Sequence, residues 1–363
     1  MLTPLHIYYW LSLSGLLSPR PGKIIEFYGS PYALWDSFSG EKKVIEPNIG
    51  DKAYAALSRL RNIDRLQEDI DEYYRQGIRM LTTEDKEFPD KLRVLGIDCP
   101  PILYCRGDIG LLGTPTVAMV GTRKCTRYGK LMAERIARGL VDAGLTVVSG
   151  LADGIDTYSH RATLEADGKT IAVLGSGINK VTPVTNRGLA MGIEKTGLII
   201  SEFLPNADGG KHTYPLRNRL ISGLSLGVVI VEAASGSGTL HTAKYALEQG
   251  REVFSVAGNA DSPQSYGTNN LIRNGEAHFV TCAEDVLGIL NIDKPVGTVK
   301  PKSLQLDVFE DGIMRILEDG AAHFDTLVTE LNILPHELSA ALSGLELKKL
   351  IIKEPSNWYK ADK

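Results

Sequence analysis

Short apolar segments alternate with helical patterns from residue 116 to residue 280, and this alternation constrains the fold more than any other feature of the sequence. The segments are unbroken apolar runs, which indicates strands that are covered on both faces of a sheet. Strands that alternate with helices predict a parallel sheet with right-handed crossovers. The strands are expected at 116–120, 145–148, 171–174, 198–201, 228–231, 253–256 and 277–280, and the helices at 128–143, 155–166, 186–195, 219–224, 240–249 and 265–274.

Different patterns flank this region, and a chain of 363 residues is long enough for two or three domains. Residues 1–75 contain short helical patterns joined by Gly/Pro breakers, which are typical of a helical packing module or of a small hairpin that binds the DNA backbone. Residues 76–291 form the main domain, and a linker is expected at 292–303. Residues 304–363 show three helices and a two-stranded wing, which is the pattern of a winged helix.

Composition limits the possible partners. The net charge is −4, so any binding of nucleic acid must come from a local basic patch rather than from bulk charge. Four cysteines without C-x-x-C spacing indicate reduced thiols. The first 20 residues match neither a signal peptide nor a membrane span. We therefore expect a cytoplasmic protein without a membrane partner.

The first strand of the main domain ends in a basic turn. Thr116–Val120 is followed by Gly121, and the helical pattern starts at Tyr128. Free N–H groups in such a turn and at the start of its helix favour an anion, usually a phosphate. The turn and helix start carry only cations, which suits a phosphate chain better than one pyrophosphate. These cations are Arg123, Lys124, Arg127 and Lys130.

A second basic cluster, Lys211–Arg219, follows a later strand and is expected at the same edge of the sheet. Its arginines, amide and aromatic ring suit phosphates and stacked bases, although a solvated loop is the alternative. Glycine-rich turns after three other strands, at 148–156, 175–177 and 233–239, should lie at this edge as well. Together, the two clusters and the turns predict a groove for nucleic acid.

The same turns offer no convincing catalytic or metal site. Asp153 and Asp156 can be an acid–base pair or hold Mg²⁺, but Asp153 is better explained as a helix cap and Asp156 as a first-turn carboxylate. His160 and His241 lack the spacing of zinc ligands and are expected to be packing or edge residues. No nucleophile–base pair is found, so we expect a protein that is not an enzyme and uses no metal or cofactor.

The motifs of the main domain occur as an ordered set. In chain order they are Val120-Gly-Thr-Arg123, Ser149-Gly-Leu-Ala-Asp-Gly-Ile-Asp156, Thr170-Ile-Ala-Val-Leu-Gly175, Ser201-Glu202, Tyr214-Pro-Leu-Arg-Asn-Arg219, Ser237-Gly-Thr-Leu-His-Thr-Ala243 and Gly267-Thr-Asn-Asn-Leu-Ile272. Over about residues 80 to 290, this set closely resembles the bacterial DNA-processing protein A family (DprA, also called Smf).

The resemblance implies an α/β fold with an extended Rossmann-like, doubly wound, mostly parallel sheet. A small N-terminal helical domain, of the SAM or helix-hairpin-helix type, and a C-terminal winged-helix domain would flank it. It also implies a homodimer that binds single-stranded DNA, protects incoming strands and loads the RecA recombinase during natural transformation. Within the main domain, apolar residues near its end, Leu271, Ile272, Val286 and Leu287, are available to pair in such a dimer.

The resemblance also assigns DNA-binding residues, with Arg123 as the pocket arginine. The full expected set is Gly121, Thr122, Arg123, Lys124, Ser149, Gly150, Gly154, Gly175, Ser176, Lys180, Arg187, Arg217, Asn218, Arg219, Ser237 and Gly238. The chain departs from the family pattern at Asp153, where members usually have Lys or Arg, and at Thr182, where they have Tyr. Members with a lysine after the following proline have a basic pocket residue where this chain has Val184, so Lys180 or Arg187 is expected to substitute for it.

The C-terminal module is acidic. From residue 301 onward it has seven Lys or Arg against eleven Asp or Glu. The expected recognition helix, 335–347, has no Lys or Arg, whereas a helix in the major groove normally presents such donors. We expect this module to bind protein, or its own main domain, rather than duplex DNA.

Two alternatives use the same crevice differently. Related Rossmann-like folds include nucleotide N-glycosidases with a catalytic glutamate close after a Gly-Thr pair. Here Gly238-Thr239 is followed by Leu240, His241 and Thr242, and the first acid is Glu248, which argues against hydrolysis. A sensor of free mononucleotides is the other alternative.

Overall fold

The computed structural model describes residues 1–292, 308–318, 320–331, 333–347 and 350–361. The chain divides into two compact units, Met1–Pro295 and Val296–Lys363, and each is described by itself. The linker that the sequence predicts at 292–303 lies outside the described residues except for Ile292.

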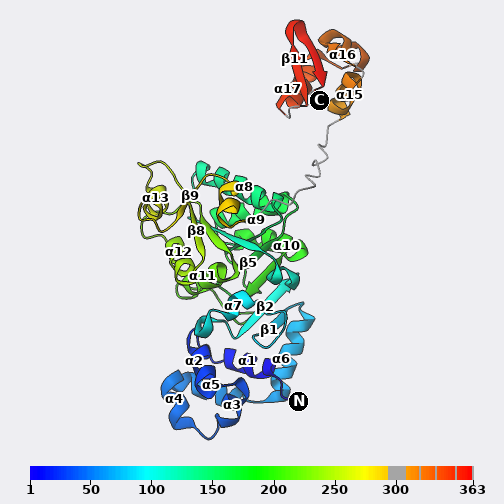
Figure 1. The fold of residues 1–363 in the computed structure, drawn as a ribbon. Helices are drawn as coiled ribbons and strands as arrows, with labels where there is room; N and C mark the ends of the chain where they lie inside the picture. Colours follow the sequence, from blue (N-terminus) through cyan, green and yellow to red (C-terminus); the bar gives the residue numbers. More distant parts are fainter. Residues whose placement is uncertain (293–307, 319, 332, 348–349, 362–363) are drawn as a thin grey trace. The chain divides into compact units, whose positions relative to one another are not determined.

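The first unit is built on a nine-stranded sheet of order β1-β2-β6-β5-β4-β3-β7-β8-β9 (Figure 1). Strands β3 to β9 are mutually parallel, whereas β2 pairs antiparallel with β6 and β1 pairs antiparallel with β2. The predicted mostly parallel sheet is therefore confirmed. The strands are β1 (Arg79–Thr82), β2 (Ile102–Gly107), β3 (Thr116–Val120), β4 (Thr146–Ser149), β5 (Thr170–Val173), β6 (Leu198–Ser201), β7 (Gly227–Ile230), β8 (Glu252–Val256) and β9 (His278–Val280).

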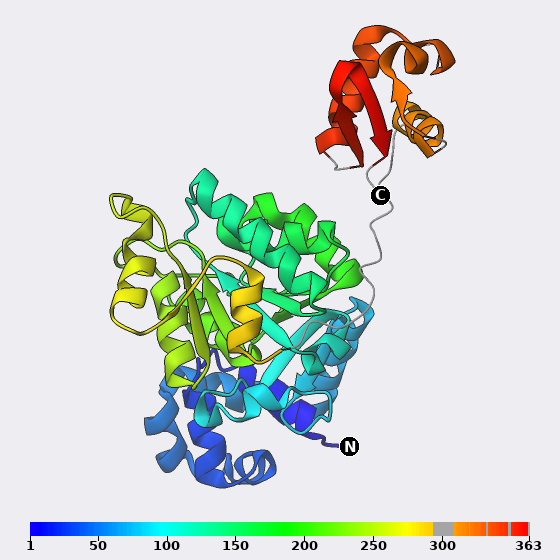
Figure 2. The ribbon, with the colours of Figure 1, turned by 45° about the horizontal axis from the view of Figure 1, so that its top comes forward.

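Helices cover both faces of this sheet, which explains its unbroken apolar strands. The ribbon shows helices on both faces of the sheet (Figure 2). On β3, Val117 and Met119 belong to one hydrophobic cluster with α8, α9 and α14, whereas Ala118 and Val120 belong to another with α11 and α12. The helices of this domain are α7 (Asp90–Arg93), α8 (Arg127–Asp142), α9 (Ile155–Glu165), α10 (Arg187–Thr196), α11 (Thr213–Leu224), α12 (Thr239–Glu248), α13 (Tyr266–Arg273) and α14 (Ala283–Ile289), with 3-10 turns at Gly96–Asp98, Ile109–Gly113, Val184–Asn186 and Pro263–Ser265.

The N-terminal helices share a hydrophobic core with one side of the sheet. Ile7 and Trp10 belong to the same buried cluster as Tyr104 of β2 and Ile199 of β6. The indole N–H of Trp10 donates to the Leu57 carbonyl oxygen at 2.8 Å, which ties α1 to α5. These helices are α1 (Pro4–Ser12), α2 (Arg20–Tyr28), α3 (Pro31–Ser37), α4 (Lys42–Ile49), α5 (Asp51–Leu60) and α6 (Ile63–Arg75). They pack as part of the first unit.

Two expectations for this unit are wrong. Helix α11 begins at Thr213 rather than at residue 219, and Pro215 lies in its first turn, where a missing N–H breaks no intrahelical hydrogen bond. Leu271, Val286 and Leu287 are buried in the hydrophobic clusters of the sheet, so they do not form a free dimer face.

The second unit has three helices and a three-stranded antiparallel sheet of order β10-β12-β11. Ile313, Leu327 and Leu342 lie in its buried core. The three helices followed by a hairpin agree with the sequence pattern, although β10 was not expected. Its elements are α15 (Val308–Glu318), β10 (Ala322–His323), α16 (Phe324–Leu331), α17 (Pro335–Leu347), β11 (Ile351–Glu354), a 3-10 turn at Pro355–Asn357 and β12 (Trp358–Ala361). Within the described ranges of both units, no helix is long and apolar enough to cross a membrane.

Candidate nucleic-acid interface

The chain reverses its direction across the sheet between β3 and β7. From β3 it adds β4, β5 and β6 on one side and then returns to place β7 on the other side of β3. Ligands of open α/β sheets bind at such a switch point, beyond the carboxyl ends of the strands. A pocket of about 530 Å³ lies there. Its lining comes from the turns after β3, β4 and β7 and from α11 and α12: Val120, Gly121, Thr122, Arg123, Ala152, Asp156, Lys211, Tyr214, Pro215, Arg217, Asn218, Ile221, Ser237, Gly238, Thr239 and Thr242.

The turn after β3 places Arg123 at this pocket. A side chain on Gly121 would lie 2.5 Å from Ile155, so the tight turn requires glycine. The N–H of Thr122 donates to the Glu232 carbonyl oxygen at 2.8 Å and fixes the turn against the end of β7. The Arg123 guanidinium is exposed and lies 5.5 Å from the centre of the Tyr214 ring. It makes no hydrogen bond or ion pair with any residue that the structure describes, so its charge is available to an anion.

The start of α8 is not available to a phosphate, contrary to the expectation from the sequence. The Glu232 carboxylate, which is buried, accepts hydrogen bonds from the Thr126 N–H at 2.8 Å and from the Thr126 hydroxyl at 2.5 Å. A carboxylate at this position satisfies the positive end of the helix dipole. The protein's own acid therefore occupies the anion site that the sequence predicted for a ligand.

The start of α12 lies at the pocket instead, although the N–H groups of Thr239 and Leu240 already donate to the Ser237 hydroxyl and carbonyl oxygens at 3.3 and 3.0 Å. Ser237, Gly238 and Thr239 line the cavity at this helix terminus. The N-cap residue, Gly238, makes no side-chain cap. Because the first N–H groups of a helix carry partial positive charge, this terminus favours an anion in the pocket.

Arg217 forms part of the floor of the pocket and is only 5% exposed. Its guanidinium donates to the carbonyl oxygens of Gly150, at 2.8 Å, and of Val173. Its Nε donates to Asn218 Oδ1 at 3.0 Å, and the side-chain nitrogen of Asn218 takes no part in this hydrogen bond. Burial lowers the pKa of Arg217 to about 10, and the neighbouring Asp156 carboxylate opposes this shift. The group stays charged at neutral pH beneath the site.

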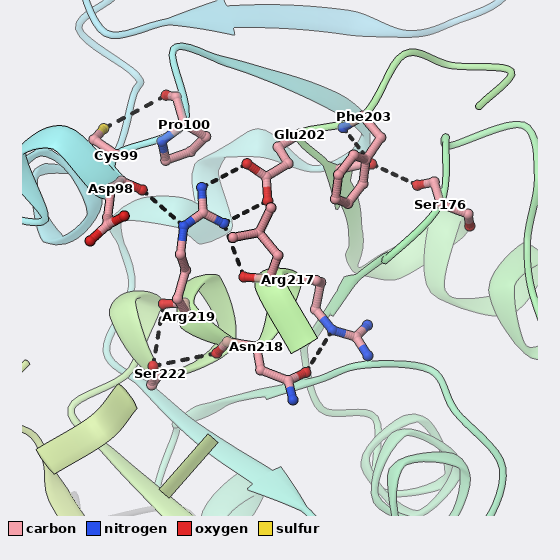
Figure 3. Close-up of polar contacts among 12 residues, drawn as sticks. Asp98, Cys99, Pro100, Ser176, Glu202, Phe203, Arg217, Asn218, Arg219 and Ser222 are labelled. Carbon is pink, nitrogen blue, oxygen red and sulfur yellow. Dashed lines mark hydrogen bonds and ion pairs between the residues drawn. The ribbon is translucent and has the colours of Figure 1, made fainter. Parts of the chain in front are cut away.

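Arg219 lies on the opposite side of α11 from this floor. Two residues correspond to about 200° around a helix, so Arg217 and Arg219 point apart. Arg219 is buried and forms a two-point ion pair with Glu202, at 2.6 and 2.7 Å, while its Nε donates to the Asp98 carbonyl oxygen at 3.0 Å (Figure 3). Only two residues of the expected arginine-asparagine-arginine segment, Arg217 and Asn218, therefore line the pocket.

The two aspartates after β4 also differ. Asp156 is buried in the first turn of α9, as expected, and accepts hydrogen bonds from the N–H groups of Gly150 and Ala152 at 3.1 and 3.4 Å. Burial raises the pKa of Asp156, and Arg217 opposes the shift. The expectation that Asp153 caps α9 is wrong, because Gly154 is the N-cap and Asp153 accepts a hydrogen bond from Thr185 at 3.3 Å instead.

Other expected site residues shape the pocket without lining it. Gly150 makes room for Arg217, since a side chain there would lie 2.6 Å from Nη2, and Gly175 makes room for the Tyr214 ring in the same way. Ser149 and Ser176 are buried and donate to the carbonyl oxygens of Met119 and Lys180. The residues of the expected set that do not line the pocket are Lys124, Ser149, Gly150, Gly154, Gly175, Ser176, Lys180, Arg187 and Arg219.

Sequence reasoning also left out several residues that line the pocket. Lys211 and Tyr214 were predicted to contact nucleic acid as part of the second basic cluster, but they were not assigned as individual site residues. Thr239 and Thr242 belong to α12 and directly follow the Gly238 motif. Lys180, which was expected to substitute for a family lysine, lies 3.7 Å from the Asp208 carboxylate instead. In the described parts of the chain, no three His, Cys, Asp or Glu side chains are grouped as metal ligands.

Comparison with known proteins identifies close relatives. The family model of DNA recombination-mediator protein A matches residues 79–291. The chain is 36% identical over 289 residues to DNA processing protein DprA of Streptococcus pneumoniae, covering 77% of this chain and 95% of the relative. It is 37% identical over 368 residues to protein Smf of Synechocystis, covering 91% of this chain and 89% of the relative.

Two solved structures are similar as well. The X-ray structure of Streptococcus pneumoniae DprA aligns with a TM-score of 0.66 at 33% identity, covering 79% of this chain and 98% of that one. A Helicobacter pylori DNA processing protein A, whose structure is described by its single-stranded DNA binding mode, aligns with a TM-score of 0.53 at 32% identity. That alignment covers 59% of this chain and 95% of the other.

Proposed function

This chain belongs to the DNA recombination-mediator protein A family, and on that premise we propose that it binds single-stranded DNA in the pocket at the switch point. In this proposal it protects incoming strands and loads the RecA recombinase onto them during natural transformation, in the cytoplasm and without catalysing a reaction. The solved Helicobacter pylori relative is described as a binder of single-stranded DNA, which supports this assignment.

The observation that carries the proposal is the pair of arginines at the pocket. The Arg123 guanidinium is exposed and unpaired among the described residues, whereas Arg217 is buried beneath the same cavity. The two guanidinium groups are close enough for Arg123 to lower the pKa of Arg217, after the larger effect of burial. With the α12 terminus, they form a concave site that attracts phosphates.

The shape of the site favours a single strand. A cavity of about 530 Å³ is suitable for a nucleotide-sized group, and the Tyr214 ring offers an aromatic surface beside it. Readout of a duplex instead requires a helix or ribbon that enters a groove. The lining of this pocket comes instead from turns and from the sides and ends of α11 and α12.

A nucleotide N-glycosidase remains the alternative function for the same pocket. Asp156 is the acid in the pocket lining, and its carboxylate accepts two backbone N–H groups next to Arg217. These contacts hold the carboxylate against the backbone of the β4–α9 turn, which favours a structural role for it. Release of free base from nucleoside monophosphates would favour the hydrolase, and its absence together with oligonucleotide binding would favour our proposal.

We also propose that the protein forms a homodimer through strand β9. This strand lies at the edge of the sheet, and Phe279 on it is 56% exposed. An edge strand with an exposed aromatic side chain is a template for pairing with a second copy. Light scattering of a Phe279→Arg variant should show a monomer, and an unchanged mass would argue against this interface.

A competition experiment tests the main proposal. The full chain is titrated with fluorescent oligo-dT, and unlabelled oligo-dT, a duplex of the same length and dTMP compete for it. We expect unlabelled oligo-dT to compete much more strongly than the duplex or dTMP. Competition by dTMP at the same concentration would instead identify a mononucleotide sensor.

A further inference from the structure

Helices α8 and α9 begin at the same edge of the sheet as the pocket, because they follow β3 and β4, and they pack side by side (Figures 1 and 2). Their first two turns carry Arg127 and Lys130 on α8 and Tyr158 and Arg161 on α9. Each pair is spaced by three residues, so its members share a face of their helix. We call these four residues the α8–α9 seam.

The two cations at the centre of the seam gather around one aromatic ring. Lys130 Nζ lies 4.9 Å and the Arg161 guanidinium carbon 6.0 Å from the centre of the Tyr158 ring. The ring is partly buried against the core and therefore holds its position, whereas the charged groups reach solvent. This arrangement brings charges from two helices together at one place.

The charge at this end of the seam is mostly uncompensated. Arg127 and Arg161 form no ion pair with any residue in the described ranges. Lys130 has only a loose partner, Glu134, at 3.8 Å, and both side chains remain accessible to solvent.

The other end of the two helices is neutral by contrast. One helical turn or more beyond the seam, Arg138 of α8 and Glu165 of α9 form an ion pair at 2.6 Å. Free positive charge on this face is therefore concentrated in the turns next to the pocket. A helix face that only contacts solvent would not require this difference in charge between its two ends.

The seam adjoins the pocket through the backbone. A side chain on Gly154, which precedes α9, would lie 2.3 Å from the Thr122 carbonyl oxygen and 2.6 Å from that of Arg123. The N–H of Ile155 donates to the Thr122 carbonyl oxygen at 3.3 Å. The start of α9 is thus fixed to the turn that carries the pocket arginine.

We propose that the α8–α9 seam is a second contact site for single-stranded DNA, which binds phosphates of the strand beyond the nucleotides held in the pocket. This inference rests on the proposed function and extends it, since it gives the bound strand a path from Arg123 across the first turns of α8 and α9. Three acids lie near this path. Asp156 in the first turn of α9 is buried, Glu134 of α8 pairs loosely with Lys130, and Asp153 lies in the loop before α9.

Length-dependent binding tests the seam in the full chain. The double variant Lys130→Gln/Arg161→Gln is compared with wild type on oligo-dT of about 4 and about 20 nucleotides, which bracket the site sizes of single-strand binders. We expect the short oligonucleotide to bind within twofold of wild type and the long one to bind about tenfold more weakly. Because each lost phosphate contact lowers the salt slope by about 0.7, the slope for the long oligonucleotide should fall by about 1.4.

The matched control is Lys169→Gln/Lys195→Gln, which removes the same charge from exposed positions at the opposite edge of the sheet, just before β5 and β6. It should bind both oligonucleotides like wild type. If the seam variant binds the long oligonucleotide as well as this control does, the seam is not a contact site. If it loses the short oligonucleotide as strongly as the long one, the seam acts through the pocket and the proposed path is wrong.

The Arg123→Ala variant separates this failure from failure of the proposed function. If Arg123→Ala binds both oligonucleotides more weakly than wild type, the pocket remains the primary site, whatever the seam variant shows. Wild-type binding of both lengths by Arg123→Ala would overturn the pocket, and the seam with it, because the path begins at that residue.

Discussion

Each unit of this chain offers an element on which nucleic acid could bind, but the two elements carry opposite charge. In the first unit, an exposed arginine, a buried arginine and a helix terminus surround one pocket. In the second, the exposed residues of α17 include Glu337 and Glu346 and no cation. The comparison shows that a fold typical of nucleic-acid binding does not by itself predict that a unit binds DNA, because phosphates require exposed positive charge at the site.

The basic residues near β11 and β12 strengthen this contrast. Lys360 forms an ion pair with Glu354 at 2.5 Å, and Lys353 lies 5.7 Å from the centre of the Tyr359 ring. Arg123 in the first unit has no such ion pair within the described residues. We therefore expect DNA to bind the first unit and protein to contact the second.

The largest expected effect follows from removing the buried arginine of the pocket. Arg217→Ala should weaken oligo-dT binding more than tenfold and destabilise the fold by about 3 kcal/mol, because Asp156 and two carbonyl oxygens lose their partner. Denaturant unfolding and a titration well below the unfolding midpoint measure the two effects separately.

The neighbouring arginine on α11 is the control for this prediction. Arg219→Ala breaks the buried ion pair with Glu202 and should destabilise the fold by a similar amount, about 3–5 kcal/mol. Under conditions where it is folded, it should retain DNA affinity, because Arg219 does not line the pocket. Equal loss of affinity in the two variants would show that α11 acts only through its packing.

The exposed arginine should affect binding without affecting stability. Arg123→Ala should weaken binding by about 1–3 kcal/mol, since one charged phosphate contact is lost, and should change stability by less than about 0.5 kcal/mol. Fluorescence anisotropy and thermal unfolding measure these quantities. Lys353→Ala in the second unit provides the comparison, and an equal loss of affinity there would remove the distinction between the units.

The first unit should also be sensitive to acid through a buried histidine near the pocket. Burial lowers the pKa of His160 to about 3 from its usual 6.5, so between these values the unfolded chain binds a proton that the folded chain does not. Stability should therefore fall by about 1.4 kcal/mol per pH unit as the pH drops below 6.5. Denaturant unfolding at pH 7 and pH 5 should show this loss in wild type and a smaller loss in His160→Asn.

An exposed histidine on α12 controls for general effects of acid. His241→Asn should keep the pH dependence of wild type, because His241 is in contact with solvent. If His160→Asn and His241→Asn respond alike, burial of the imidazole does not control the acid sensitivity.

Much of the sheet and part of the site follow from local sequence. Each strand of the parallel region is a short apolar run. Gly121, followed by Arg123, predicts the basic turn at the edge of the pocket. The start of α11 could not be predicted, because Pro215 and its polar neighbours are typical of a loop. Without that helix, the sequence did not show that Arg217 and Arg219 point to opposite sides of it.

Other features depend on residues that are distant in the sequence. Glu232 lies 106 positions from Thr126, so nothing near the β3–α8 turn shows that its helix terminus is already occupied. The antiparallel edge strands β1 and β2 join the sheet through β6, a pairing that their own composition does not encode. Long-range pairing of this kind is decided by the whole fold and not by local pattern.

The smallest expected effect lies in the second unit. Lys353→Glu/Lys360→Glu reverses two charges on the hairpin, and the affinity of the full chain for oligo-dT should change by less than twofold. The same titration as for Arg123→Ala measures it. A loss of tenfold or more would place a DNA contact in the second unit and contradict the assignment drawn from its acidic helix.

Photocrosslinking tests most directly where the strand binds. An oligo-dT that carries 5-iododeoxyuridine is crosslinked to the full chain, and the modified peptides are identified by mass spectrometry. Because aromatic rings react with this base, we predict crosslinks on the peptide that contains Tyr214, which lines the pocket, and their loss in Arg123→Ala. Crosslinks confined to the peptide that contains Trp358 and Tyr359 would contradict the central claim.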